Sequence, residues 1–448
     1  MGDLGAGSLE ARYAPSREAA ADWDWPAYDF LIPPNWPSGA YLAVVSGASD
    51  ADPGEASPHK SEAPRAYAER GQALFVVKNR DLAARASILY KLPLFTYHAY
   101  TLGDVAFAEG KRAALGSWQD GQCLYTGGVA VSLRRPGGGT GGRPWDAINL
   151  DEYDKTTPRQ TFAHWDAPFI AWLARNGFEV DFCTDWDLHR QSAQLQSYAL
   201  LLSAGHDEYW SDAMRAAAQG FVRVGGNIAF FGGNTAYFRV TLDADDMLVS
   251  RAGSWTTKGR GSTAMRQREN ALTGVSYNNG GGKWKGGRPA TGYRVQHADH
   301  WVYEGTGLRD GDIFGAEPRL IGYECDGAAF NRVKFTRSGY AQPTHKDGTP
   351  RSFEILGVGD IKAWDVSEGG EVLGNAAATM GTYTQGGTVF TAATVDWPRI
   401  VAFELDASTV QITRNVLTRL SRRAHDEDLA RNALPNVDRP ERTGAAVQ

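Results

Sequence analysis

The stretch Tyr198-Ala-Leu-Leu-Leu-Ser-Ala-Gly-His-Asp-Glu-Tyr-Trp-Ser211 decides the fold that we predict for this chain. Its apolar run, residues 199–204, is typical of a strand that is buried on both faces of a parallel sheet. Gly205 ends the strand, and Ser211 followed by an alanine-rich run predicts the N-cap of a helix. Ligands of open α/β sheets bind beyond the carboxyl ends of the strands. The polar residues after Gly205 are therefore the candidate site.

Alternating strand and helix patterns flank this stretch. We expect helices near 169–175, 185–196, 214–224 and 409–420, and strands near 178–183, 227–231, 320–324, 353–356 and 388–392. Residues 232–239 are expected to form a second strand-to-helix turn. This alternation predicts a doubly wound, mostly parallel α/β sheet.

The domain organisation follows from where the pattern changes. Short apolar runs at 40–45, 73–77, 86–90 and 129–133 predict a β-rich, sandwich-like domain over 23–150. We expect the α/β domain to span 151–422, with a loop-rich insertion over 251–293. Residues 1–22 are an N-terminal extension, and 423–448 are predicted to be a flexible tail.

Composition limits the function classes. The chain has 448 residues, of which 42% are apolar and 22% are charged, as in soluble globular proteins. Its net charge of −6 argues against nucleic acid and anionic membranes as partners. No apolar run approaches membrane-spanning length, no secretory signal is visible, and three cysteines suggest a reducing compartment. We expect a cytoplasmic protein with a small-molecule substrate, and a homo-oligomer is left open.

The candidate catalytic residues are His206, Asp207 and Glu208, because imidazole and carboxyl groups transfer protons. Turn N–H groups near Gly205 would stabilise an oxyanion. The structural alternative is a helix-entry cluster in which the acids favour the helix dipole and the aromatic residues pack on the sheet.

The candidate substrate-binding residues are Asn234, Arg239 and Trp210. Asn234 could instead cap a helix, and Arg239 could pair with a surface acid. Two further pairs have similar alternatives. Glu324 and Asp326 share one face of a strand, as in a metal site, a pocket wall or a solvated edge. Asp185 and His189, spaced i and i+4, suit a local hydrogen-bonded pair.

Several motifs together resemble the large-subunit domain of N,N-dimethylformamidase and its bacterial relatives. They are Trp36-Pro-Ser-Gly-Ala-Tyr41, Leu92-Pro-Leu-Phe-Thr-Tyr-His-Ala-Tyr100, Trp172-Leu-Ala-Arg-Asn-Gly177, Ser203-Ala-Gly-His-Asp-Glu-Tyr-Trp-Ser211, Phe230-Phe-Gly-Gly-Asn-Thr-Ala-Tyr237 and Ile412-Thr-Arg-Asn-Val-Leu417. The resemblance implies a core similar to class I glutamine amidotransferases and a β-sandwich-like N-terminal part.

The resemblance also implies an amide hydrolase with one iron ion, held by two tyrosines and a glutamate. Tyr209 matches one tyrosine, and Glu269 is the best match to the glutamate. The second tyrosine belongs near Trp172, where the chain has Pro168. Iron is therefore one alternative, and a metal-free site in which His206 or Glu208 activates water is the other.

The function that these observations favour is hydrolysis of a C–N, amide-type bond in a small or medium organic substrate. The second hypothesis is a non-catalytic protein whose tryptophan-rich flap binds a ligand, since the chain has 14 tryptophans. A third is a tailoring enzyme of secondary metabolism that has changed reaction on the same scaffold.

Overall fold

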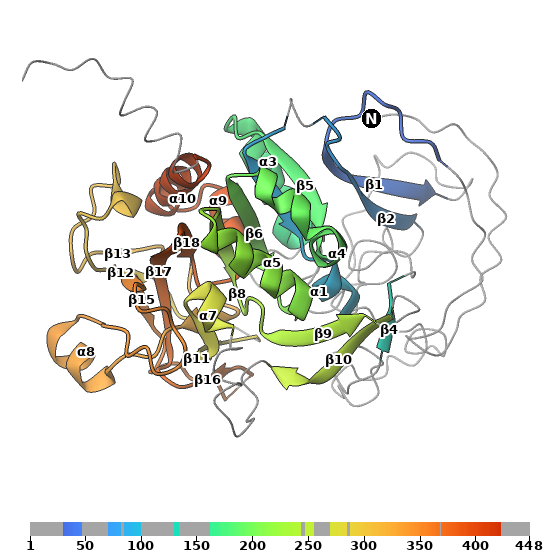
Figure 1. Ribbon diagram of the computed structural model, residues 1–448. Helices are drawn as coiled ribbons and strands as arrows, with labels where there is room; N and C mark the ends of the chain where they lie inside the picture. Colours follow the sequence, from blue (N-terminus) through green and yellow to red (C-terminus); the bar gives the residue numbers. More distant parts are fainter. Residues whose placement is uncertain are drawn as a thin grey trace, which may run out of the picture.

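The computed structural model describes residues 30–46, 70–81, 85–99, 130–133, 162–242, 247–254, 269–284, 287–367 and 369–422. Within these residues, the centre of the fold is a nine-stranded sheet (Figure 1). In spatial order its strands are β13 (Ile313–Phe314), β12 (Tyr293–Val295), β15 (Glu354–Asp360), β17 (Ala377–Gln385), β18 (Gly387–Thr391), β8 (Asn227–Gly233), β6 (Leu200–His206), β3 (Ile88–Leu92) and β5 (Val180–Thr184).

The large sheet has a parallel half and an antiparallel half. Strands β18, β8, β6, β3 and β5 run parallel, whereas β13, β12, β15, β17 and β18 pair antiparallel. The predicted α/β class is confirmed, but the predicted mostly parallel sheet holds for one half only. The hairpin at Gly386 explains the change, because so short a turn can only reverse the chain, while parallel neighbours need a crossover.

Helices cover both faces of this sheet. On one face, α4 (Asp185–Arg190) packs through Leu188 and α5 (Asp212–Arg223) through Met214 and Phe221, in the same apolar cluster as Leu201 of β6. On the other face are α3 (Phe162–Arg175), α9 (Trp397–Ala402) and α10 (Ala407–Leu420), whose side chains cluster with Leu202. Alternate residues of β6 thus enter different cores, as the period of a strand requires.

Three smaller sheets and several short helices complete the described chain. The sheets are β1 (Gly39–Ser46) with β2 (Arg70–Val77); β4 (Ala130–Ser132), β10 (Met247–Ser254), β9 (Phe238–Leu242) and β7 (Tyr209–Ser211); and β14 (Cys325–Gly327), β11 (Ser276–Gly282) and β16 (Glu371–Val372). The short helices are α1 (Leu94–Ala99), α7 (Asn270–Thr273), α8 (Arg332–Ser338), and the 3₁₀ helices η4 (Ser192–Ser197) and η5 (Trp301–Tyr303). No helix of the described ranges is long and apolar enough to cross a membrane.

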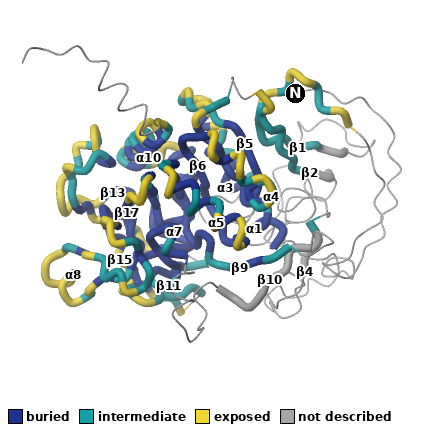
Figure 2. Tube along the Cα trace, in the orientation of Figure 1, coloured by how far each residue is buried: buried dark blue, intermediate teal, exposed yellow. Residues whose placement is uncertain are grey.

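The predicted central strand is confirmed. All seven residues of β6 are buried, and the tube in Figure 2 is dark blue along this strand. The helix after it is also confirmed, because the Ser211 side chain caps α5 by accepting the backbone N–H of Met214 at 3.2 Å. Between the two, residues 209–211 form the short strand β7, which pairs with β9.

Two local predictions are wrong. Residues 232–239 lead into β9 and not into a helix, because Phe-Arg-Val-Thr-Leu has the residue types and alternation of a strand. The strand expected at 320–324 begins only at Cys325.

The predicted domain division stays a prediction. Strand β3 comes from the expected β-rich part, yet it lies between β6 and β5 in the large sheet. The described part of the expected insertion, 251–293, contains the end of β10, helix α7 and strand β11. The extension 1–22 and the tail 423–448 lie outside the described residues.

Candidate functional site

Two glycines shape the sheet edge at which the candidate site lies. Gly205 has a φ of +66°, and a Cβ added there would meet the side chain of Trp165 at 2.7 Å. Gly233, at the end of the neighbouring strand β8, lets the backbone oxygen of Glu324 approach to 2.7 Å from where its Cβ would be. Glycine is required at both places, and it brings α3 and the segment before β14 against the ends of β6 and β8.

His206 lies between two carboxylates at this edge. Its Nε2 is 2.7 Å from Oε2 of Glu324 and 3.6 Å from Oε2 of Glu208. His206 and Glu208 are buried, and the Glu324 side chain is 9% exposed. The structure therefore brings the predicted His206 and Glu208 together with Glu324. The sequence alone left open whether Glu324 belongs to a metal site, a pocket wall or a solvated strand edge.

Asn234 joins the two glutamates. Its side-chain Nδ2 donates to Oε1 of Glu208 at 2.8 Å and to Oε2 of Glu324 at 3.3 Å. Asn234 has a φ of +51°, in the left-handed region that asparagine tolerates better than most residues. The predicted neighbourhood of Asn234 and His206 follows from the parallel pairing of β6 and β8.

Asp326 holds the turn that carries Asn234. Its two carboxylate oxygens accept the backbone N–H groups of Asn234, at 2.9 Å, and of Thr235, at 3.2 Å. Burial raises the pKa of Asp326 to about 7, although these two hydrogen bonds act to lower it. Of the readings given above for Glu324 and Asp326, a solvated strand edge is wrong, because both side chains are buried.

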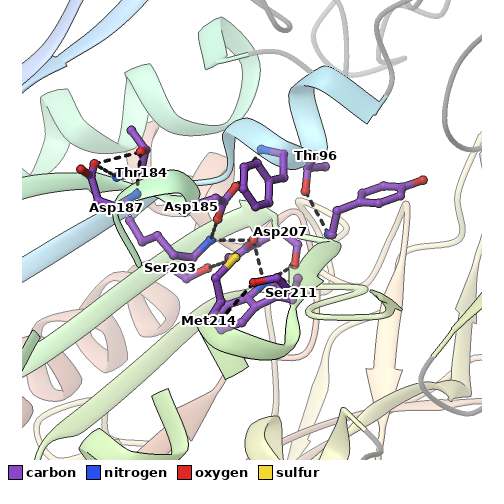
Figure 3. Close-up of polar contacts among 12 residues, drawn as sticks. Thr96, Thr184, Asp185, Asp187, Ser203, Asp207, Ser211 and Met214 are labelled. Atoms are coloured by element: carbon purple, nitrogen blue, oxygen red, sulfur yellow. Dashed lines mark hydrogen bonds and ion pairs between the residues drawn. The ribbon is translucent and has the colours of Figure 1, made fainter. Parts of the chain in front are cut away.

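Asp207 points into a different cluster from its neighbours. Lys91 forms buried ion pairs with Asp207, at 2.8 Å, and with Asp185, and Figure 3 shows the side chains of these two acids close to one another. Asp207 also accepts from Ser203 at 2.6 Å and from the indole N–H of Trp210 at 2.9 Å. Side chains alternate along an extended chain, so Asp207 faces away from His206 and Glu208.

In the Lys91 cluster, burial and the neighbouring charges shift the pKa values in opposite directions. Burial lowers the pKa of Lys91, but the charges of Asp185 and Asp207 outweigh it and leave that pKa above its usual value. Burial raises the pKa of Asp185 to about 7, against the lowering effect of Lys91. The predicted local pair of Asp185 with His189 is wrong, since His189 bonds the Ser211 hydroxyl at 2.7 Å instead.

Thr96 fixes the backbone directly after Asp207. Its hydroxyl oxygen accepts the backbone N–H of Glu208 at 2.9 Å and that of Tyr209 at 3.3 Å. Thr96 lies in α1, directly after the β3 strand that contributes Lys91. The first hundred residues thus supply two positioning side chains that the sequence did not indicate. The available signal was a lysine inside the apolar run Ile-Leu-Tyr-Lys-Leu of β3.

The other predicted substrate-binding residues lie elsewhere. Arg239, on β9, forms an ion pair with Asp212 in which both side chains are well exposed, 40% and 53%. This is the surface pair named above as its alternative. Trp210 is fully buried and donates its indole N–H to Asp207.

The predicted iron ligands do not make a complete set. Tyr209 is buried and stacks on Phe238 with ring centroids 5.1 Å apart. Glu269 is buried at the start of α7, where it accepts the Ser276 hydroxyl. Pro168, where the second tyrosine was expected, lies inside α3. In the part of the chain that the structure describes, no group of three or more His, Cys, Asp and Glu side chains could hold a metal ion. Proline has no side-chain ligand atom, so the residues at these positions do not supply the two tyrosines and one glutamate of the expected iron site.

An aromatic cluster lies beside the acid–base group. Trp165, Tyr323 and Val395 form a small core of their own, against which the partly buried Trp284 packs. The rings of Trp165 and Tyr323 are 6.4 Å apart between centroids. Tyr323 precedes Glu324 in the chain, so this cluster borders the carboxylate that is least buried.

Comparison with known proteins points to one family. The family model described as "N,N-dimethylformamidase beta subunit-like, C-terminal" matches residues 6–408. An N,N-dimethylformamidase beta subunit from Alcaligenes sp. is 28% identical over 199 residues, which are 38% of this chain and 26% of that protein. Another, from Paracoccus aminophilus, is 24% identical over 302 residues, 58% of this chain and 38% of that protein. The matched part is thus less than half the length of either relative.

Two solved structures have a weak likeness to the chain. One is a beta-galactosidase from Bacillus circulans sp. alkalophilus, with a TM-score of 0.31 and 10% identity, covering 58% of this chain and 26% of that one. The other is a putative ThuA-like protein from Bacteroides uniformis, with a TM-score of 0.31 and 12% identity, covering 57% and 81%. Likeness at this level carries no argument about the fold.

Proposed function

Because the chain belongs to the N,N-dimethylformamidase beta subunit-like family, we propose that it hydrolyses the C–N bond of a small amide at His206, Glu208 and Glu324. The observation that carries this proposal is the His206 Nε2 to Glu324 Oε2 contact of 2.7 Å, with Glu208 on the other side of the same nitrogen. An imidazole between two carboxylates suits a reaction that takes one proton from water and gives one to a leaving nitrogen.

In the proposed mechanism Glu208 is the general base. Its carboxylate takes a proton from water while the water oxygen bonds to the amide carbon. The C–N bond then breaks, and the departing nitrogen takes a proton from the His206 imidazolium, which Glu324 stabilises by its negative charge. The proton on Glu208 returns to His206, 3.6 Å away, and the products are a carboxylic acid and an amine.

Access to this group is part of the proposal. His206 and Glu208 are buried, so the substrate reaches them only when neighbouring side chains move. The approach past Tyr323 and Trp284 is the one we favour, because Glu324 is the most exposed member of the group and Trp284 is only partly buried. Planar aromatic walls also suit the planar amide group.

The test is release of amine from a panel of small formamides and acetamides. Glu208→Gln and His206→Ala should each lower kcat/KM by about a hundredfold or more, in protein whose far-ultraviolet circular dichroism matches that of the parent. Glu354→Gln is the matched control, because Glu354 is an exposed glutamate of β15. Full activity in Glu208→Gln would contradict the assignment of the base, and unfolding of both variants would support a structural role instead.

A second candidate function is ligand binding without turnover, and the aromatic cluster of Trp165, Tyr323 and Trp284 favours it. It predicts saturable binding of a planar ligand that quenches tryptophan fluorescence, with no product after long incubation.

Two finer expectations stay within the proposal. The first is a core similar to class I glutamine amidotransferases, which the parallel half of the large sheet supports. The second is assembly with further subunits, since the two relatives are named as beta subunits.

A further inference from the structure

Two buried polar atoms beside the acid–base group have no hydrogen-bond partner among the described residues: Oδ1 of Asn234 and Nε1 of Trp165. Asn234 is 4% exposed and Trp165 is 1% exposed, so bulk solvent does not reach these atoms in the folded chain. An unpaired buried donor or acceptor costs about 1–3 kcal/mol, and native proteins contain few of them. The Asn234 acceptor and the Trp165 donor, both unpaired, point to a ligand that has a hydrogen-bond donor for the first and an acceptor for the second.

The orientation of the Asn234 amide follows from its neighbours. Both hydrogens of Nδ2 are used, one toward Glu208 and one toward Glu324. Exchanging Oδ1 and Nδ2 would put an oxygen against two carboxylates, so the acceptor must be the open end. Oδ1 therefore requires a donor, and a carboxylate-rich site selects against an additional negative charge.

The Trp165 donor borders the same site. Its side chain packs on Gly205, the residue before His206, and Gly205 pairs with Gly232 in the sheet, just before Asn234. Its ring also lies beside that of Tyr323, whose neighbour Glu324 contacts the Asn234 amide. Trp165 thus contacts Tyr323, and Asn234 contacts the next residue, Glu324.

We propose that these two atoms bind the amide group of the substrate, with Asn234 Oδ1 accepting a substrate N–H and Trp165 Nε1 donating to the substrate carbonyl. This inference rests on the proposed function and narrows its substrate class to primary and secondary amides. A tertiary, N,N-dialkyl amide has a carbonyl for Trp165 but no N–H for Asn234. Sites built to bond a substrate N–H reject analogues that lack it, because the buried partner is then left unpaired.

The experiment compares matched pairs that differ in one N–H: N-methylformamide with N,N-dimethylformamide, and N-methylacetamide with N,N-dimethylacetamide. Binding is measured by calorimetry and turnover by amine release, both with the full chain. We expect the member with the N–H to bind and react at least about tenfold better. Asn234→Gly, which tolerates the positive φ, should reduce this preference to about twofold or less, even if total activity falls.

Trp165→Phe gives the complementary result. It removes the N–H and keeps an aromatic ring, so both members of a pair should weaken by the same factor and the preference should persist. Trp364→Phe is the matched control, because its indole N–H bonds Thr291 outside the site.

The outcomes separate this inference from the proposed function. Hydrolysis of both members at equal rates would overturn the inference and leave the hydrolase standing. Preferential binding of the N–H member without any turnover would support the Asn234 site and overturn the hydrolase. A preference that persists in Asn234→Gly would overturn the role of Asn234, and absence of both binding and turnover for all four amides would overturn both proposals.

Discussion

Asp326 accepts the backbone N–H of Asn234 at 2.9 Å, and this bond holds the left-handed turn that places the Asn234 amide between Glu208 and Glu324. The second oxygen of Asp326 accepts the next backbone N–H, from Thr235. The Asp326 carboxylate thus holds the turn through two backbone N–H groups, and neither of these hydrogen bonds involves His206 or Glu208. Its effect on the site is exerted through Asn234.

Asp326→Asn should loosen this turn, because an amide offers one acceptor oxygen where two backbone N–H groups need one each. We expect kcat for amide hydrolysis to fall about tenfold, with the N–H preference of the parent reduced and the far-ultraviolet circular dichroism unchanged. Asp360→Asn, at an exposed ion pair with Arg332, is the control and should keep full activity. If Asp326→Asn keeps the kcat of the parent and its preference for amides with an N–H, the turn does not need both hydrogen bonds of Asp326.

The same aspartate should make stability depend on pH. Its pKa is about 7 in the folded chain, against a usual value of 3.8, because burial penalises the charged form. Between these values the folded chain retains a proton that the unfolded chain has lost, so this group's contribution to stability decreases as pH rises from about 4 to 7.

Urea denaturation of the parent and of Asp326→Asn at pH 4.5 and pH 7.5 measures this contribution. The parent should lose more stability than the variant over this interval. Asp185, whose pKa is also about 7, adds a slope of the same sign to both proteins, so the difference between them isolates Asp326. A variant that loses as much as the parent would contradict the prediction.

Lys91→Met should strongly destabilise the fold. It leaves Asp185 and Asp207 buried without their counter-ion, and breaking a buried ion pair in this way costs about 3–5 kcal/mol. The measurement is the free energy of unfolding from urea denaturation at pH 7.5.

Lys78→Met is the control for Lys91→Met, because the side chains of Lys78 and its partner Asp187 are 37% and 15% exposed. Such a pair contributes less than about 1 kcal/mol. If the two variants lose equal stability, burial does not increase the contribution of the Lys91 ion pairs to the free energy of unfolding.

Gly205→Ala should cost more than backbone strain alone. A left-handed φ costs roughly 1–2 kcal/mol for a residue with a Cβ, and at Gly205 that Cβ would also meet Trp165 at 2.7 Å. Gly177→Ala is matched for strain, since Gly177 has a φ of +74° and open space around it.

Thermal unfolding of the two glycine variants separates strain from steric contact. Gly205→Ala should have the lower melting temperature and should also lose activity, because Trp165 must shift away from the site. Equal melting temperatures would show that Trp165 moves without cost.

Local patterns predicted the elements that organise the fold. The apolar run ending at Gly205 predicted a fully buried strand, and Ser211 predicted the cap of the helix after it. Helix α10 lies where its apolar stripe predicted it, and the predicted helix 169–175 is the second half of α3. The motifs also indicated the family that the match over residues 6–408 confirms. These features depend on neighbours in sequence, so the sequence alone determined them.

Tertiary structure decided which polar residues meet. Glu324 contacts His206 and Lys91 contacts Asp207 across long stretches of chain, and no spacing in the sequence indicates either pair. The pleat then assigned adjacent residues to different clusters, with Asp207 toward Lys91 and with His206 and Glu208 toward Glu324. The antiparallel half of the sheet escaped prediction for the same reason, because strand direction is set by which distant segments pair. A sequence specifies the chemistry that each residue can perform, whereas packing between remote segments determines its partner.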